Sequence, residues 1–179
     1  MKALIIGDML NDFVTGALKC ERAQRIIPNI KKLADVCRSS GIPVIYLNDR
    51  HLKVDKELHL WGEHAMVGTK GAEVIPELMV EDGDYVVHKR RYSGFFATAL
   101  DLLLRELHID EIIVTGLLTN LCVLHTAADA YFRGYNTIIA EDGVEALTQE
   151  DQEGALEYMK KFYEARVLKT DELIGEIQK

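Results

Sequence analysis

The sequence is poor in cysteine and in positive charge, and both shortages exclude classes of protein. Three cysteines among 179 residues are too few and too scattered for a disulfide framework or a CxxC metal site, which fits a reducing compartment. Lys and Arg number 21 against 29 Asp and Glu, and the net charge is -8. Nucleic acids and anionic membranes attract a basic face, so neither is expected as a partner.

Long apolar runs and a targeting segment are also missing. No run of about 18 apolar residues occurs, and the first residues do not combine a basic region with an apolar stretch. We therefore expect a cytoplasmic protein without a membrane helix. No Pro/Gly/Ser-rich linker, internal repeat or low-complexity tract divides the chain. Its length predicts one domain over residues 1–179.

Motifs of several common α/β enzymes are absent as well. The turn after residues 2–7 has neither a GxGxxG nor a Walker A spacing, so a phosphate-binding loop is not expected. Position 10, where an aspartyl phosphatase would have its second acid after Asp8, is Leu10. No GxSxG sequence of the serine α/β hydrolases occurs.

Short apolar segments alternate with amphipathic segments along the chain. The strand-like segments are residues 2–7, 43–48, 85–88, 111–115, 137–140 and 166–168, and helical periodicity covers residues 28–40, 94–107, 120–133 and 149–162. This alternation predicts a three-layer αβα fold with a six-stranded parallel sheet. The expected strand order is the Rossmann-like 3-2-1-4-5-6. The long polar segment 50–75 interrupts the pattern, and such a segment in a compact domain is usually functional.

Four reactive side chains lie at or just past the C-terminal ends of separate predicted strands: Asp8, Asp49, Lys89 and Cys122. Ligands of open parallel sheets bind beyond these strand ends, so the four side chains are expected to meet at one rim. An aspartate alone would indicate a turn or a helix cap, but neither requires a lysine or a cysteine. Because the start of a helix lowers the pKa of a thiol, we interpret Cys122 as a nucleophile.

Asp49 and His51 form a separate candidate metal half-site. Residues i and i+2 of an extended segment lie on the same side, and His64 follows 13 residues after His51, close enough to return as a third ligand. One carboxylate and two imidazoles suit zinc, manganese or iron. We expect a divalent metal, with zinc as the first choice. The alternative is a metal-free enzyme in which these residues contact substrate or solvent.

Blocks of residues along nearly the whole chain resemble the isochorismatase-like cysteine hydrolases, the superfamily of nicotinamidases, N-carbamoylsarcosine amidohydrolases and ureidoacrylate-type amidohydrolases. The blocks are Asp8 with Asp12-Phe13, Asn48 to His51, Gly62 to Ala65, Gly68 to Glu73, Lys89 to Phe95, and Gly116 to Val123. The resemblance implies that Asp8, Lys89 and Cys122 form a catalytic triad. It also implies a cis peptide bond between Leu117 and Leu118, with the amides of Leu118 and Cys122 as the oxyanion hole.

The resemblance narrows the expected activity. True isochorismatases lack the cysteine, so Cys122 favours cleavage of a small-molecule amide or carbamoyl (ureido) C-N bond through a thioester or thiocarbamate. Arg50 and Ala65 stand where nicotinamidases typically have tryptophan and cysteine, and the segment from Leu60 to Glu73 is closer to carbamoyl-amide hydrolases. We therefore expect an N-carbamoylsarcosine amidase-like enzyme, with a nicotinamidase or pyrazinamidase as the first alternative.

The remaining expectations concern partners and other classes of function. Phe13, Trp61 and Tyr92 are expected to contact the small-molecule substrate, and similar family members are commonly tetramers or larger, which predicts a homo-oligomer. A non-catalytic small-molecule binding protein is disfavoured because all three triad residues are present. A thiol-redox protein that uses Cys122 is disfavoured because no resolving cysteine lies nearby in the sequence.

Overall fold

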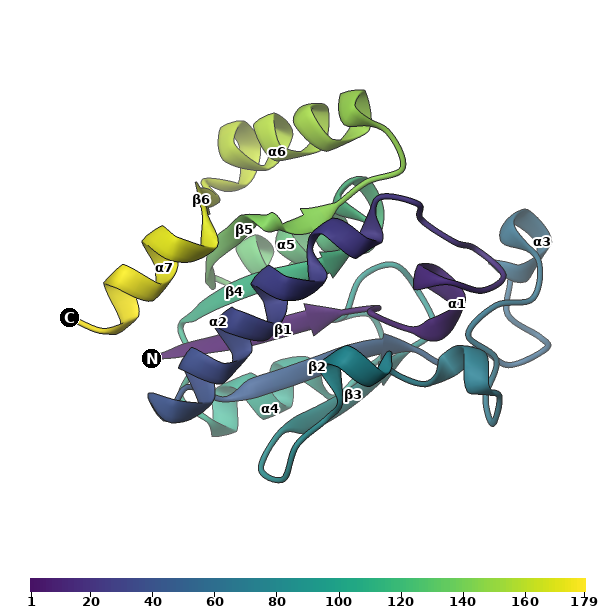
Figure 1. Cartoon of the computed structure of the whole chain (residues 1–179), viewed down its shortest axis with the longest axis horizontal. Helices are drawn as coiled ribbons and strands as arrows, with labels where there is room; N and C mark the ends of the chain where they lie inside the picture. The colour runs from purple at the N-terminus through teal and green to yellow at the C-terminus, as the bar shows by residue number, and fades with distance from the viewer.

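A six-stranded parallel sheet forms the centre of the computed structural model, which describes residues 1–179 (Figure 1). The strands are β1 (Lys2–Gly7), β2 (Val44–Asp49), β3 (Tyr85–Lys89), β4 (Glu111–Leu117), β5 (Asn136–Glu145) and β6 (Arg166–Leu168). Their order is β3-β2-β1-β4-β5-β6, and every neighbouring pair is parallel. The predicted fold class and strand order are therefore confirmed.

Helices cover both faces of this sheet (Figure 1). One face is covered by α2 (Ile27–Ser39) and α7 (Thr170–Ile177), and the other by α4 (Leu100–Glu106), α5 (Leu124–Phe132) and α6 (Gln149–Tyr163). Two short helices, α1 (Asn11–Val14) and α3 (Leu58–Trp61), lie beyond the C-terminal ends of the strands. None of the helices combines the length and the apolar character that a bilayer span requires.

Two apolar cores separate the sheet from its two helical layers. In β1, Leu4 and Ile6 belong to the core beneath α2, whereas Ala3 and Ile5 belong to the core beneath α4, α5 and α6. Successive side chains of a strand point to opposite faces, so a strand that is covered on both sides must be apolar throughout. This requirement explains why the central strands are recognisable as continuous apolar segments.

Two expected elements differ from the structure by five or more residues at one end. Residues 94–99 were expected to be helical, but α4 begins only at Leu100 because Ala97 has a left-handed φ of 53°, which interrupts an α-helix. Strand β5 continues to Glu145, five residues beyond the predicted end, because a register shift in its pairing with β4 lets the two strands pair again after an irregular segment.

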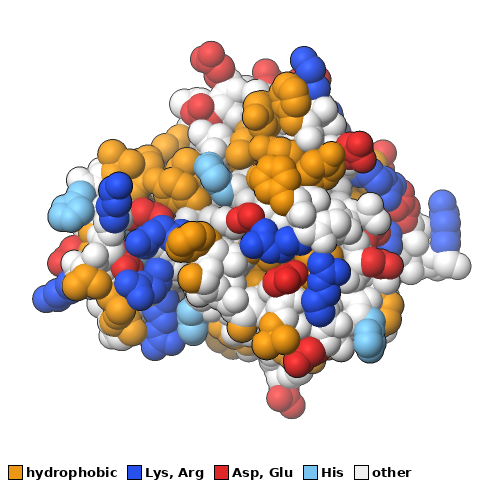
Figure 2. All heavy atoms as spheres, turned by 180° about the vertical axis from the view of Figure 1, so that it is seen from behind, with side chains coloured by type: hydrophobic (Ala, Val, Ile, Leu, Met, Phe, Trp, Pro, Cys, Tyr) orange, Lys and Arg blue, Asp and Glu red, His pale blue; other side chains and the backbone are white.

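Aromatic side chains are exposed on the outer face of α5 and α6. Figure 2 shows hydrophobic side chains gathered in the upper part of the face that these helices cover. The exposed aromatic residues are Tyr131, Phe132, Tyr158 and Phe162. Their rings pack on one another and on Tyr163, with centroids 4.6 to 6.0 Å apart. A patch of this kind suits an interface between subunits, and the homo-oligomer stays a prediction.

Candidate active site and metal centre

A cavity of about 320 Å³ lies at the C-terminal ends of β1, β2 and β4. Its wall is mostly apolar and includes the three predicted substrate contacts, Phe13, Trp61 and Tyr92. The indole Nε1 of Trp61 donates a hydrogen bond to the hydroxyl of Tyr92 at 2.9 Å, which joins α3 to the segment after β3. The structure therefore brings all three aromatic residues to one wall.

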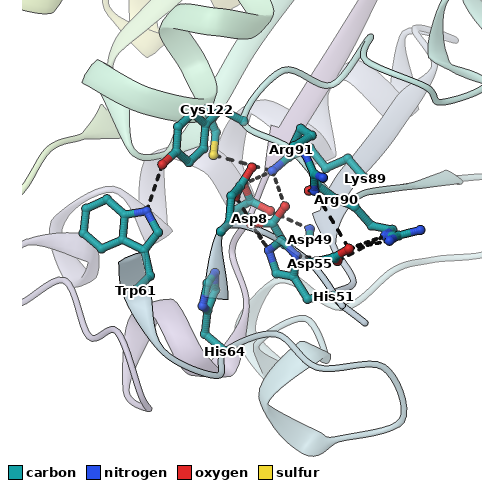
Figure 3. Close-up of polar contacts among 12 residues, drawn as sticks. Asp8, Asp49, His51, Asp55, Trp61, His64, Lys89, Arg90, Arg91 and Cys122 are labelled. Atoms are coloured by element: carbon teal, nitrogen blue, oxygen red, sulfur yellow. Dashed lines mark hydrogen bonds and ion pairs between the residues drawn. The ribbon is translucent and has the colours of Figure 1, made fainter. Parts of the chain in front are cut away.

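The predicted triad residues lie together beside this cavity, and two of them, Asp8 and Cys122, line it (Figure 3). The ammonium Nζ of Lys89 lies 2.8 Å from Asp8 Oδ2 and 3.5 Å from Cys122 Sγ. Lys89 is fully buried, although its backbone lies on edge strand β3, two strands away from the strand that precedes Asp8. Its long side chain crosses β2, and this reach is what brings the three groups together.

Asp49 belongs to the same cluster, as its position at a strand end predicted, although its expected role was that of a metal ligand. Its Oδ1 accepts a hydrogen bond from Lys89 Nζ at 2.6 Å. Its backbone N–H donates to Asp8 Oδ1 at 2.7 Å. One buried ammonium therefore contacts two buried carboxylates, and Asp49 connects the triad to the metal-ligand candidates.

The charges of this cluster are set by burial and by the ion pairs. Burial and the neighbouring Asp49 carboxylate raise the pKa of Asp8 to about 6, although Lys89 acts in the opposite direction. Burial alone would lower the pKa of Lys89, but Asp49 and Asp8 outweigh it and raise that pKa well above its ordinary value. Lys89 is therefore a cation, whereas Asp8 changes charge near pH 6.

The Cys122 thiol differs from the expectation of a low pKa. Burial makes the largest contribution and raises the pKa of the thiol, and Asp8 and Asp49 raise it further against the effect of Lys89. The expected helix start is also displaced, because α5 begins at Leu124 and Cys122 lies in the preceding π-helical turn, Thr119–Val123. The expectation of a lowered pKa was wrong, so the resting sulfur keeps its proton until a base accepts it.

The backbone beside the thiol has the conformation that the resemblance implied. The peptide bond between Leu117 and Leu118 is cis. The amide N–H of Leu118 donates no hydrogen bond to another group of the protein. Both Leu118 and Cys122 line the cavity. A backbone amide without a protein partner therefore belongs to a residue of the same cavity lining as the sulfur.

The three metal-ligand candidates form a second polar cluster beside the first. One ligand atom each from Asp49, His51 and His64 lies within 4.8 Å of the other two, and all three residues are buried. Nδ1 of His51 donates to Asp55 at 3.0 Å, and Nδ1 of His64 donates to the carbonyl of Gly62 at 2.7 Å. In both rings Nε2 is the nitrogen that is left for a ligand.

The donor set fits a divalent cation. Nε2 of His51 is buried and has no hydrogen-bond partner in the protein, although buried polar atoms are normally paired. The carboxylate oxygen Oδ2 of Asp49 lies 3.6 Å from this nitrogen. Two imidazole nitrogens and a carboxylate oxygen are ligands that zinc and similar ions accept.

Sequence reasoning missed two acidic residues of segment 50–75. Glu57 lines the cavity, its Oε2 lies 3.9 Å from His51 Nε2, and burial together with Asp49 raises the pKa of its carboxyl group. Asp55 is buried behind His51. Acidic residues are common in polar loops, so neither position had a signal beyond its place in an unusually long loop.

Comparison with known proteins identifies the family. Residues 2–172 match the model of the isochorismatase domain. The crystal structure of N-carbamoylsarcosine amidase from Thermoplasma acidophilum is 40% identical, with a TM-score of 0.90 over 95% of this chain and 96% of that one. Nicotinamidase/pyrazinamidase PncA from Bacillus subtilis is 35% identical, with a TM-score of 0.89 over 94% of this chain and 99% of that one.

A third structure is relevant to the metal-ligand cluster. Pyrazinamidase of Pyrococcus horikoshii, described in complex with zinc, is 28% identical, with a TM-score of 0.88 over 94% of this chain and 98% of that one. The match covers nearly the whole chain in every case. The chain belongs to the isochorismatase family of hydrolases, as its sequence motifs implied.

Proposed function

We propose that this isochorismatase-family hydrolase is a single catalytic domain, residues 1–179, that cleaves the C-N bond of a small amide or carbamoyl compound with Cys122 as the nucleophile. One observation supports this most directly. The buried Lys89 ammonium lies within 3.5 Å of the Cys122 sulfur and within 2.8 Å of the Asp8 carboxylate, beside a cavity of substrate size. A nucleophile, a base and a cation are thereby present at one point.

Asp8 is the base of the proposed reaction. Its pKa of about 6 leaves it ionised at neutral pH, so it can accept the thiol proton as the sulfur attacks the carbonyl carbon. The C-S bond forms while the carbonyl π electrons move onto oxygen. Lys89 stays charged beside the sulfur and stabilises the negative charge that develops there.

The tetrahedral oxyanion is bound by the backbone amides of Leu118 and Cys122 in this proposal. One such donor typically contributes ~2.7–4 kcal/mol to lowering the barrier. Asp8 then returns its proton to the leaving nitrogen, and the C-N bond breaks. An amide leaves a thioester on Cys122, whereas a ureido substrate leaves a thiocarbamate. Water attacks this intermediate with Asp8 again as base, which releases the acid product and the thiol.

We further propose that Asp49, His51 and His64 hold a divalent cation, with zinc as the first choice and manganese or iron as alternatives. The unpartnered Nε2 of His51 and the zinc complex of the pyrazinamidase relative support this proposal. With three protein ligands, the ion would keep positions for water or substrate and would supply Lewis acidity and orientation. The carboxylate of Asp49 would then serve both the ion and Lys89.

N-carbamoyl compounds are the first candidate substrates, because N-carbamoylsarcosine amidase is the relative with 40% identity. Nicotinamide or pyrazinamide is the second candidate. The aromatic wall formed by Phe13, Trp61 and Tyr92 favours it, since planar heteroaromatic rings pack on such walls. The two candidates differ in what the outer part of the cavity must bind: a flexible acidic group or a flat ring.

A substrate panel tests both candidates. Ammonia release would be measured with N-carbamoyl amino acids, ureidoacrylate, nicotinamide and pyrazinamide, using the wild type and Cys122→Ala side by side. Turnover that requires Cys122, together with a substrate-sized mass increase on the Cys122 peptide after rapid quenching, supports the proposal. Binding without turnover would indicate a binding protein. Turnover by Cys122→Ala at the wild-type rate would contradict the cysteine mechanism.

A further inference from the structure

We infer that Asp55 and Arg90 are positioning residues of the metal centre: Asp55 fixes the His51 ring with Nε2 directed at the cation, and Arg90 fixes Asp55. This inference rests on the metal centre proposed above. Asp55 is a buried carboxylate that no step of the proposed reaction uses, and it lies directly behind a candidate ligand.

The carboxylate of Asp55 is hydrogen-bonded on both of its oxygens (Figure 3). Oδ2 accepts from His51 Nδ1 at 3.0 Å and from the backbone N–H of Leu52 at 2.9 Å. The guanidinium of Arg90 binds the other side, with Nε 2.9 Å from Oδ1 and Nη2 on the same oxygen. Asp55 therefore lies between an imidazole on its inner side and a guanidinium on its outer side.

These contacts determine which nitrogen of His51 can bind a metal. A carboxylate oxygen only accepts hydrogen bonds, so Nδ1 of His51 must hold a proton, and the lone pair of the neutral ring lies on Nε2. Nε2 is the buried atom without a protein partner, and it faces Asp49 and His64. Loss of such a supporting carboxylate typically lowers metal affinity by about 10–100-fold.

Arg90 makes the buried position of Asp55 possible. A carboxylate without a partner is costly to bury, and the guanidinium of Arg90 supplies Asp55 with an opposite charge and with hydrogen bonds from Nε and Nη2. Arg90 directly follows Lys89, so the same pair ties the end of β3 to the loop that begins after β2. The side chain of Arg90 is itself 47% exposed, and Figure 2 shows Lys and Arg side chains gathered at the end of the molecule that also carries α3.

The opposite end of β3 provides a matched control. Asp84, directly before β3, accepts from Arg38 Nε at 3.2 Å and from Arg38 Nη2 at 2.7 Å, and its side chain is 3% exposed. This is the same kind of buried arginine–aspartate pair on the same edge strand. It contacts neither the cavity nor a metal-ligand candidate. If the loss of any buried ion pair were enough to weaken Zn²⁺ binding, Asp84→Leu would therefore bind Zn²⁺ more weakly as well.

The test measures metal affinity rather than turnover. Metal-free protein would be titrated with Zn²⁺ against a chromophoric chelator, and Co²⁺ spectra would report the coordination. We expect Asp55→Leu to bind Zn²⁺ about 10–100-fold more weakly than the wild type, and Arg90→Gln to show a smaller loss. Asp84→Leu should keep wild-type affinity for Zn²⁺. His51→Ala lacks a proposed ligand and shows how far the affinity falls when a ligand itself is removed.

Each outcome decides one point. If the wild type and Asp84→Leu bind no Zn²⁺, the proposed metal centre is wrong and the inference is overturned with it. If His51→Ala loses Zn²⁺ but Asp55→Leu keeps it, only the role of Asp55 is overturned. Should Asp55→Leu not fold, Asp55→Asn and Arg90→Gln replace it. If these two variants show the ¹⁵N shifts of the wild-type His51 tautomer and bind Zn²⁺ with wild-type affinity, the inference is refuted.

Discussion

The cavity is built from two regions that are held in place by different means. Asp8, Asp49 and Lys89 stand at the ends of sheet strands, and the parallel ladder sets Asp49 directly opposite Lys89. His51 and His64, by contrast, belong to segment 50–75, whose backbone hydrogen bonds to the rest of the protein lie at its two ends, at Arg50 and at Glu73–Ile75. Between these ends, side chains such as those of Asp12 and Arg90 connect the segment to neighbouring elements. Continuous strand pairing therefore fixes the triad side, whereas the metal side depends on a few backbone hydrogen bonds and on individual side chains.

Substitutions are therefore expected to act differently on the two sides of the cavity. On the metal side, a carboxylate oxygen of Asp12 accepts a hydrogen bond from the backbone N–H of Ala65, the residue after His64, at 2.8 Å. Removing one such contact frees a part of the loop. On the triad side, the strand hydrogen bonds persist when a side chain changes, so a substitution acts through its own charge or chemistry.

Cys122→Ala is expected to lower turnover by about 10⁴-fold or more, because no other group can form the covalent intermediate. The strands that hold the site are unaffected, so the melting temperature should stay close to that of the wild type. Iodoacetamide should label Cys122 well before Cys20 or Cys37, which are both buried in the apolar core. Faster labelling of Cys37, measured by peptide mass spectrometry, would contradict the assignment.

Lys89→Met is expected to cost both activity and stability. It leaves the carboxylates of Asp8 and Asp49 buried without their cation, which typically costs ~3–5 kcal/mol of unfolding free energy. Protonation relieves this penalty, so the loss should be larger at pH 8 than at pH 5. Urea unfolding at the two pH values measures it, with Lys89→Arg as the charge-conserving control. Equal losses at both pH values would show that the buried carboxylates are not responsible.

Removal of the metal is expected to lower activity by at least the roughly 10–100-fold that loss of a supporting residue typically costs, while changing the melting temperature little, because the loop does not hold the two cores together. His51→Ala should behave like chelation. Metal analysis of protein purified without a chelator provides the control. Well under one ion per chain, with activity indifferent to added zinc, manganese or iron, would leave a metal-free amidase.

The ratio kcat/KM is expected to rise with pH through about 6. Burial raises the pKa of Asp8 to about 6, so below that pH the carboxyl group is protonated and cannot accept the thiol proton. Activity should fall roughly fivefold between pH 6 and pH 5 as the ionised fraction falls. Initial rates from pH 4.5 to 8, with circular dichroism at each pH, measure this. A flat profile down to pH 5 in folded protein would exclude Asp8 as the base.

The smallest effect is expected at the aromatic wall. Trp61→Phe keeps a ring but removes the hydrogen bond to the Tyr92 hydroxyl, and one such bond is typically worth ~0.5–1.5 kcal/mol. A few-fold rise in KM with little change in kcat is expected. Tyr92→Phe removes the other partner and should give the same shift. If the two variants differ widely in KM, the shared hydrogen bond does not explain the effect.

Much of the site could be predicted because its residues follow strands. Strands β1 and β6 have their predicted bounds, and the ends of parallel strands must lie at one edge of a sheet. That rule was sufficient to bring Asp8, Lys89 and Cys122 together. By contrast, α1, α3 and α7 were not predicted, and α4 and β5 have other bounds, because a left-handed residue and a pairing irregularity leave no periodic signal.

The alternation of strands and helices, the apolar character of both strand faces and the reactive side chains at the strand ends could be read from the sequence, since these depend on periodicity and on local position. Only the tertiary structure decided that Asp49 serves Lys89 as well as the metal-ligand candidates, that burial raises the pKa of the Cys122 thiol, and that Asp55 supports His51. These properties depend on distances between side chains from different segments and on exclusion of water, and no local pattern encodes either.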